Sequence, residues 1–454
     1  MAVYADRDAF IPYRRSDLVE LCLSEGKLDR AAAQQFREFA EILAAYYHFE
    51  FHRDLEIIKD SFAPFNPDSA TKSIRELTTE ESQERQERLV HAFEHVLERA
   101  NYQPISKESL ERAFEEEALI ELKTDVQFDD FEYFSCFCRG DIFETVEVKK
   151  FFKKKPVTID VFERVALLMK YKDADYFEAQ GAKLEKLKFT PGKFYVALYK
   201  NVPKSDLEFL FPNVKVSMTL KDRLTFFVPA IGAAVPILIK VLPQLLLIVG
   251  VVMVLIPNVE PPDSGLLQAT EEDAQNLSRL MLTILSMLVV LGGFAFKQYS
   301  KYQSKQLKFQ KNVSDTLFFR NIASNASVFN SLIDSAEEEE CKEILLVYYH
   351  LLTKGRAMTR DELDDTIETW MEEKFGTKID FDINGPLGNL AKLKGEYIDD
   401  DGDPVIAPLL SVTPQKRYRV LSLERSKQAI DWIWDNAFSY SDEAEAEPIP
   451  AGRR

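Results

Sequence analysis

The longest apolar stretch of the chain runs from Phe226 to Ile256 and contains one charged residue, Lys240. About 20 apolar residues cross the hydrocarbon core of a membrane as a helix, because each residue rises about 1.5 Å. Residues 236–256 have this length, and we expect Lys240 to extend its ammonium to the lipid headgroups from near one end of the span. The alternative is a deeply buried Lys240 that serves an ion path. The preceding residues, 226–235, either lie flat in the membrane interface or re-enter the membrane.

A second apolar run, residues 280–296, carries no charge and lies at the short end of the spanning range. Its Gly292 and Gly293 would let another helix approach closely, although glycine is also common in membrane helices in general. The two runs together predict a transmembrane hairpin that occupies residues 221–300.

The charges around the two runs predict their orientation. The linker 257–278 has no Lys or Arg and five acidic residues. By the positive-inside rule this linker faces outward and both termini face the cytoplasm, as in a multi-pass protein of the cell membrane. The expected contacts with the membrane surface are Lys240 and the lysines after the second run, Lys297, Lys301, Lys305, Lys308 and Lys311. An ordinary positively charged flank explains the same lysines.

The net charge of −18 argues against a general nucleic-acid binder, which needs a basic surface. Four cysteines are too few and too scattered for a disulfide framework and fit a reducing compartment. The first residues lack the apolar segment of a signal peptide and contain too many acidic residues for a transit peptide, so we interpret them as the mature N-terminus.

Residues 1–220 read as a cytoplasmic α+β region with helical and mixed α/β parts. Residues 28–51 show helical spacing with Asp29 as N-cap. Residues 81–101 form a second amphipathic pattern whose apolar stripe is Leu89, Phe93, Val96, Leu97 and Ala100. Four aromatic and β-branched segments then predict strands at 131–140, 141–151, 161–172 and 192–202.

Residues 301–440 predict a cytoplasmic, winged-helix-like C-terminal domain. Three helices at 337–355, 359–376 and 384–395 precede a two-stranded wing at 397–423 and a last helix. The third helix would read DNA in a helix-turn-helix protein, but it offers only Lys392 and Lys394 beside four aspartates. We therefore expect a protein contact and no nucleic acid. The tail 441–454 is acidic and predicts disorder.

One motif suggests a metal site. His91 and His95 fit the H-x-x-E-H pattern of inverted zinc peptidases, and their spacing places both imidazoles on one face of a helix. That face is the polar one and no third ligand follows from the sequence, so a solvated surface pair is the alternative.

Other motifs fail on their spacing. His52-Arg53-Asp54 opens like a kinase catalytic loop, but Lys59 occupies the position of the required Asn. Residues 399–403 lack the Gly and Glu positions of a calcium loop and fit a polar turn better. Cys136 and Cys138 have no second close pair for zinc and fit a packed core. The sequence predicts no catalytic residue and no cofactor, and whether the protein is an enzyme is left open.

Several blocks of sequence resemble one protein family. They are FHRDLEIIKDSFAPFNPD (51–68), VFERVALLMKYK (161–172), KNVPKSDLEFLFPN (200–213), FFRNIASNASVFNSLIDSAEEEECKEILLVYYHLL (318–352) and WDNAF (434–438). The family consists of two-span membrane proteins of unknown function from bacteria, chloroplasts and mitochondria. The resemblance implies a membrane hairpin between soluble halves and implies no catalytic residues. The missing transit peptide favours a bacterial cytoplasmic membrane.

These observations predict an integral membrane protein of unknown biochemical role that acts as a membrane-tethered protein-interaction or scaffold module. Its expected partners are the lipid bilayer and a protein bound through the cytoplasmic domains. The alternative is an ion-conducting or transport component, formed when the hairpin assembles into a homo-oligomer.

Overall fold

The computed structural model describes residues 10–68, 74–75, 77–110, 122–150, 153–211, 213, 215–218, 239, 277–376 and 378–437. The chain forms two compact units, each built from separated segments. Unit 1 combines residues 1–113, 128–207 and 320–454, and unit 2 combines residues 114–127 and 208–319.

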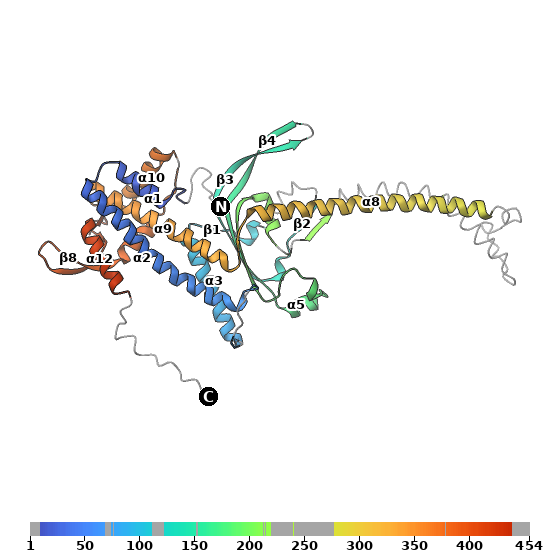
Figure 1. The fold of residues 1–454 in the computed structure, drawn as a ribbon, viewed down its shortest axis with the longest axis horizontal. Helices are drawn as coiled ribbons and strands as arrows, with labels where there is room; N and C mark the ends of the chain where they lie inside the picture. The colour runs from blue at the N-terminus through green and yellow to red at the C-terminus, as the bar shows by residue number, and fades with distance from the viewer. Residues whose placement is uncertain are drawn as a thin grey trace, which may run out of the picture. The chain divides into compact units, whose positions relative to one another are not determined.

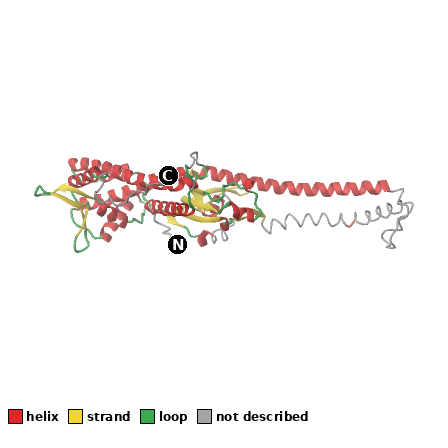
Figure 2. Ribbon diagram, turned by 90° about the horizontal axis from the view of Figure 1, so that it is seen from below, coloured by secondary structure: helices red, strands yellow, loops and turns green. Residues whose placement is uncertain are grey.

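Unit 1 contains a group of helices and a five-stranded sheet (Figures 1 and 2). Its α-helices are α1 (Arg15–Ser24), α2 (Arg30–Phe62), α3 (Thr79–Arg99), α5 (Ala174–Ala179), α9 (Ala326–Lys354), α10 (Arg360–Phe375), α11 (Asn384–Lys392) and α12 (Leu423–Asp435). Short 3-10 helices are η1 (Ala63–Phe65), η2 (Phe128–Asp130), η3 (Leu184–Lys186) and η4 (Lys204–Leu210). The strands are β1 (Gln103–Pro104), β3 (Phe131–Lys150), β4 (Lys153–Tyr171), β5 (Phe194–Pro203), β7 (Asn321–Ser324), β8 (Lys394–Ile398), β9 (Pro404–Pro408), β10 (Leu410–Val412) and β11 (Tyr418–Val420).

The helix starts follow local sequence signals. Asp29 caps α2, as predicted, by accepting a hydrogen bond from the backbone N–H of Ala32 at 2.8 Å. Thr78 and Thr359 each form a capping box with the Glu three residues later. The predicted apolar stripe of α3 is also confirmed, since all five of its residues are buried.

The five-stranded sheet is antiparallel and has the strand order β1-β3-β4-β5-β7. In its central strand, β4, the consecutive residues 165–169 are all buried, so both faces of the sheet are covered there. The segments predicted as two strands, 131–140 and 141–151, form one strand. Gly140 permits this with a φ of +69°, and a Cβ at this position would lie 2.6 Å from the Glu163 carboxylate.

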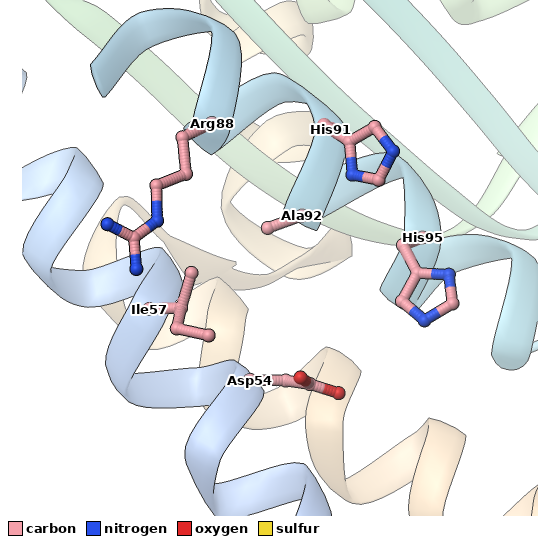
Figure 3. A pocket seen from close by; sticks show the side chains of 6 residues that line it. All are labelled: Asp54, Ile57, Arg88, His91, Ala92 and His95. Atoms are coloured by element: carbon pink, nitrogen blue, oxygen red, sulfur yellow. The ribbon is translucent and has the colours of Figure 1, made fainter. Parts of the chain in front are cut away.

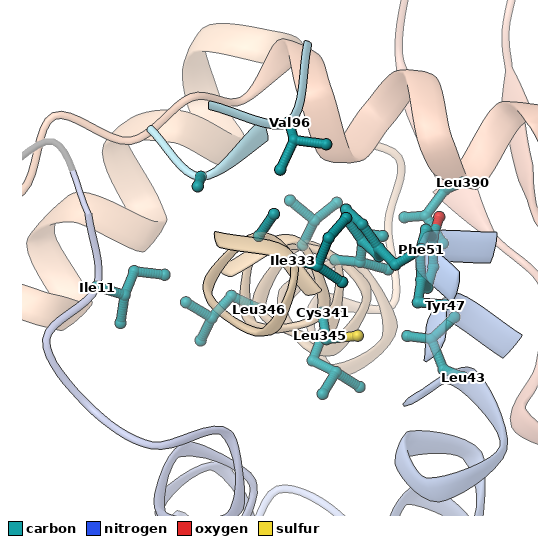
Figure 4. Close-up of a cluster of buried hydrophobic side chains, with 14 of the residues drawn as sticks. Ile11, Leu43, Tyr47, Phe51, Val96, Ile333, Cys341, Leu345, Leu346 and Leu390 are labelled. Atoms are coloured by element: carbon teal, nitrogen blue, oxygen red, sulfur yellow. The ribbon is translucent and has the colours of Figure 1, made fainter. Parts of the chain in front are cut away.

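Helix α9 lies at the centre of unit 1. It packs against α1, α2, α3, α10 and α11 as well as against the sheet strands β5 and β7. Figure 4 looks along α9 and shows Tyr47 and Phe51 of α2 on one side, Ile11 on the opposite side and Val96 of α3 above. Because neighbours surround the helix, its residues from Glu339 to Leu351 are all buried.

Four charged side chains of α9 lie inside this core: Glu339, Glu340, Lys342 and Glu343. Lys342 pairs with Glu339 at 2.6 Å, and both bind the backbone of Ile11: Lys342 donates to its carbonyl and Glu339 accepts from its N–H. Burial, together with the nearby Glu339, raises the pKa of Glu343 well above its usual range. The Asn101 amide donates a hydrogen bond to the Glu343 carboxyl at 2.8 Å.

Glu340 is held by two other elements of the fold. The Arg99 guanidinium at the end of α3 donates to it at 2.6 Å, and the Asn389 amide of α11 donates at 2.7 Å. Arg99 also pairs with Asp54 of α2 at 2.9 Å and lies 3.7 Å from the centre of the Phe51 ring. One arginine thus links α2, α3 and α9.

The C-terminal part of unit 1 contains the helices predicted there. The prediction of one two-stranded wing at 397–423 is wrong, because this part of the chain forms two hairpins, β8–β9 and β10–β11. The turn 399–403 closes the first of them, and the N–H of Asp403 donates to the Asp399 carboxylate at 3.0 Å, which confirms the predicted polar turn. Gly395 is required beside α12, because a Cβ there would lie 2.0 Å from the carbonyl oxygen of Ala429.

Among its described residues, unit 2 has two short antiparallel strands and one long helix. Strand β2 (Leu122–Asp125) pairs with β6 (Lys215–Met218). Helix α8 (Leu277–Arg320) supplies most of the remaining described residues.

The predicted transmembrane hairpin is wrong. In the part of the chain that the structure describes, no helix combines the length and the apolarity that crossing a membrane requires. The apolar run 280–296 belongs to α8, and its 17 residues span about 25 Å, less than the hydrocarbon core of about 30 Å. The predicted first span, 236–256, and Lys240 lie outside the described residues, apart from Ile239.

This finding corrects the fold class and the predictions that depend on it. The described chain is a mixed α/β protein with a five-stranded antiparallel sheet. The multi-pass membrane location with cytoplasmic termini and the ion-conducting alternative both required the hairpin, and both are wrong on the same evidence.

We expect Arg99→Met to lower the free energy of unfolding by about 3–5 kcal/mol, because it leaves the Glu340 carboxylate buried without its cation. Urea denaturation followed by circular dichroism measures this change. The double variant Arg99→Met/Glu340→Met should regain part of the loss. The matched control is Arg37→Met, which removes an exposed pair with Glu20 and should have no measurable effect. Equal effects of Arg99→Met and Arg37→Met would contradict the assignment.

Candidate functional site

The predicted histidine pair lies in a pocket between α2 and α3. Figure 3 shows His91 and His95 one turn apart on the same side of α3, with Asp54 of α2 across from them. Ile57, Arg88 and Ala92 complete the lining of a pocket of about 340 Å³. Both imidazoles are exposed to solvent.

Two acidic groups near this pair, Asp54 and Glu94, already have partners. Asp54 binds Arg99, and Glu94, the glutamate of the H-x-x-E-H pattern, accepts a hydrogen bond from the Tyr133 hydroxyl at 2.9 Å. Within the described ranges, no three His, Cys, Asp or Glu side chains are grouped so that they could hold a metal ion. The zinc site at His91 and His95 therefore stays a prediction without a third ligand.

A second pocket, of about 400 Å³, lies between α9 and α10, beside Lys27 of the α1–α2 connection. His350 and Lys354 are one turn apart on α9. The residues from α10 follow a helical spacing that places them on one side of that helix: Asp365, Thr366, Thr369, Trp370 and Glu373. The pocket thus brings together groups from three segments of unit 1.

His350 is the unusual member of this lining. Its side chain is only 1% exposed, and neither ring nitrogen has a hydrogen-bond partner in the described part of the protein. Its ring lies edge-on to Trp370, with centroids 5.4 Å apart. An unsatisfied buried polar group destabilises the folded state by about 1–3 kcal/mol. The unpaired imidazole of His350 therefore lowers the stability of the fold.

Burial, and to a smaller extent the nearby Lys27 ammonium, together lower the pKa of His350 from its usual value to about 4. At physiological pH the ring is therefore neutral. A neutral imidazole has one N–H donor and one acceptor nitrogen, and at His350 both are unused.

The charged residues around His350 are not all paired. Lys27 binds Glu25 at 2.5 Å. Lys354, Asp365 and Glu373 have no ion-pair partner among the residues with described side chains. The pocket therefore presents one unpaired cation and two unpaired carboxylates next to a neutral imidazole. Such a lining is polar, and among the described residues it contains no group of three His, Cys, Asp or Glu that could hold a metal ion.

No sequence motif indicates this second site. His350 stands within the apolar run 344–352 that was interpreted only as a helix. The sequence indicates the site only through His350 itself, a polar residue within an apolar run. The structure shows that this run belongs to the buried part of α9. The partners on α10 could not be assigned from spacing alone, because they come from a different helix.

The other predicted positions fall on ordinary structural features. All four cysteines are free and buried, and burial raises the pKa of Cys136 and Cys138, which keeps both thiols protonated. The five predicted membrane-contact lysines after residue 296 all lie on α8, and three of them are exposed where side chains are described: Lys297, Lys301 and Lys311.

Comparison with known proteins gives one family. Residues 162–327 are similar to a family described as "Protein of unknown function (DUF3754)", and this segment runs from β4 through unit 2 to the first residues of α9. The description assigns no biochemical role, in agreement with the predicted unknown role. The resemblance to a family of two-span membrane proteins is wrong, since the match supports only this family of unknown function and no described helix can span a membrane. No solved structure matches the chain.

The low pKa of His350 predicts a specific dependence of stability on pH. The unfolded chain takes up a proton on this residue near pH 6.5, whereas the folded protein does so only near pH 4. The free energy of unfolding should therefore fall by up to about 3 kcal/mol as the pH decreases from 6.5 to 4. Urea denaturation at a series of pH values measures the fall.

The variant His350→Phe should lose this part of the pH dependence, because phenylalanine does not titrate. The matched control is His52→Phe, which changes an exposed histidine and should keep the wild-type slope. A slope in His350→Phe equal to that of the wild type would contradict the assignment.

Proposed function

We propose that this protein is a protein-interaction module that binds a partner through the outer part of the β3–β4 hairpin. This part, residues 143–150 and 153–160, is called the arm. The observation that carries the proposal is that the arm continues the hairpin beyond the sheet (Figure 1). Eight residue pairs, from Phe143 with Asp160 to Lys150 with Lys153, form a ribbon about 27 Å long.

In the described part of the chain, the arm consists of two strands. On one side, β5 pairs with β4 only from Val161 onward, and on the other, β1 pairs with β3 only at Phe137 and Cys138. No third strand pairs with the arm among the strands that the structure describes. Pro156 fits this arrangement, because prolines within sheets are confined to edge strands and bulges.

Open strand edges favour the addition of another strand. The unpaired N–H and C=O groups of an edge can bind an extended segment of another protein, and proteins usually protect such edges. A two-stranded ribbon is also only marginally stable on its own in water. A partner strand beside the arm would satisfy its backbone groups and stabilise it.

The charge of the arm indicates the chemistry of the partner. Lys149 is paired in register with Lys154 and Lys150 with Lys153, so the last two residue pairs of the hairpin both consist of lysines. Such pairs are destabilising unless anions neutralise them. The acidic residues of the arm lie nearer its base, the end at Phe143 and Asp160, than these lysines do. The whole chain is acidic, with a net charge of −18, so the basic tip differs from the rest of the chain. The arm therefore favours an extended partner segment that contains Asp or Glu.

The earlier expectation placed the protein contact on the C-terminal domain. There, the helix in the position of a DNA reader, α11, faces the core: Leu387 and Leu390 are buried, and Asn389 binds Glu340 of α9. This helix is used for packing, which favours the arm as the contact surface.

Selection from a phage-displayed library of linear peptides tests the proposal. The wild-type protein should select peptides rich in Asp and Glu, and their binding should weaken as salt increases. A variant in which Asn-Gly replaces residues 144–159 should lose this binding while its thermal unfolding stays unchanged. Selected peptides that bind the shortened variant equally well would contradict the proposal.

A pair of charge variants isolates the role of the tip. The triple variant Lys149→Glu/Lys150→Glu/Lys153→Glu should bind the selected acidic peptides at least about tenfold more weakly. The control makes the same charge change at three exposed lysines elsewhere in unit 1, Lys183, Lys186 and Lys188. Equal losses in the two triple variants would show that only net charge matters and would overturn the arm as the binding element.

A further inference from the structure

We propose that the pocket between α9 and α10 binds a small zwitterion of the free α-amino acid class. This site is separate from the arm, so the proposal goes beyond the protein-interaction function and stands or falls independently of it. The pocket is lined by His350, Lys354, Asp365, Thr369 and Glu373, with Lys27 and the Trp370 ring beside them.

The buried imidazole of His350 lacks a hydrogen-bond partner among the described residues. His350 is 1% exposed and lines the pocket, yet neither of its ring nitrogens has a hydrogen-bond partner in the described structure. Buried polar groups in folded proteins are nearly always paired, and an exception indicates a missing partner. A polar molecule in the pocket would provide that partner, because the neutral ring can donate one hydrogen bond and accept another.

The charges of the lining select the type of molecule. Lys354 is a cation without an ion-pair partner, and Asp365 and Glu373 are carboxylates without one, as far as side chains are described. A simple anion would meet the two carboxylates, and a simple cation would meet Lys354 and Lys27. A molecule that carries both an ammonium and a carboxylate satisfies both kinds of group.

The helical spacing supports simultaneous contact. Lys354 is one turn from His350 on α9, and Asp365, Thr369 and Glu373 follow each other at single turns along α10. The α9–α10 pair therefore presents the cation and the imidazole on one side and the carboxylates on the other.

Isothermal titration calorimetry with the full-length protein tests this proposal. The probes are the free α-amino acids, one at a time at up to millimolar concentration. Each amino acid that binds is then compared with its N-acetyl and carboxamide forms. We expect at least one free amino acid to bind saturably, and we expect either cap to weaken binding at least about tenfold, because each cap removes one charge. Absence of saturable binding by every free amino acid, or equal binding of the capped forms, would overturn the proposal.

Three variants link the binding to the pocket. His350→Phe should stay folded, because it replaces unpaired nitrogens with an apolar ring, and it should weaken binding at least about tenfold. Glu373→Gln should also weaken binding, whereas the control Glu372→Gln changes a neighbouring exposed residue outside the pocket and should not. Unchanged affinity in folded His350→Phe would overturn the proposal. Peptide binding at the arm is measured separately, so the two proposals can fail independently.

Discussion

The burial of charged groups on α9 is the constraint on which unit 1 depends. Glu339, Glu340 and Lys342 are removed from water by helices and strands on several sides, and each needs a partner in the core. The partners come from distant parts of the sequence: the backbone of Ile11, Arg99 at the end of α3, and Asn389 of α11. A different arrangement of these helices would leave a charge buried and unpaired. The charged groups therefore restrict the arrangement of the helices more strictly than apolar contacts alone would.

This constraint also positions the two features to which function is assigned. The network around Glu340 occupies the middle of α9, while His350 lies nearer the end of the same helix, and its two ring nitrogens make no hydrogen bond with the described residues. The sheet is held against the helices through buried residues of β4 and β5. The arm begins where that sheet ends, and its backbone edges do not take part in the core. The protein thus keeps its rigid part separate from the parts that are proposed to bind.

Local signals in the sequence predicted local structure well. The Asp29 cap, the apolar stripe from Leu89 to Ala100 and the polar turn at 399–403 depend on residues close together in the chain. Features that depend on tertiary surroundings were missed. The acidic run before Cys341 has the composition of a solvated surface, and only the encircling helices show that it is buried. The pocket at His350 required a second helix, and no spacing rule could supply it. The apolar run 280–296 suggested a membrane span because apolar composition alone does not distinguish a span from part of a longer helix such as α8.

Hydrogen–deuterium exchange on the free, full-length protein tests the central claim most directly. The claim is that the arm stands outside a core fixed by α9 and is open to a partner strand. The account predicts slow exchange in α9 and in the paired residues 161–170 of β4, and much faster exchange in residues 143–150 and 153–160. Protection of the arm equal to that of residues 161–170 would show that its edges are already covered, and this result would contradict the account.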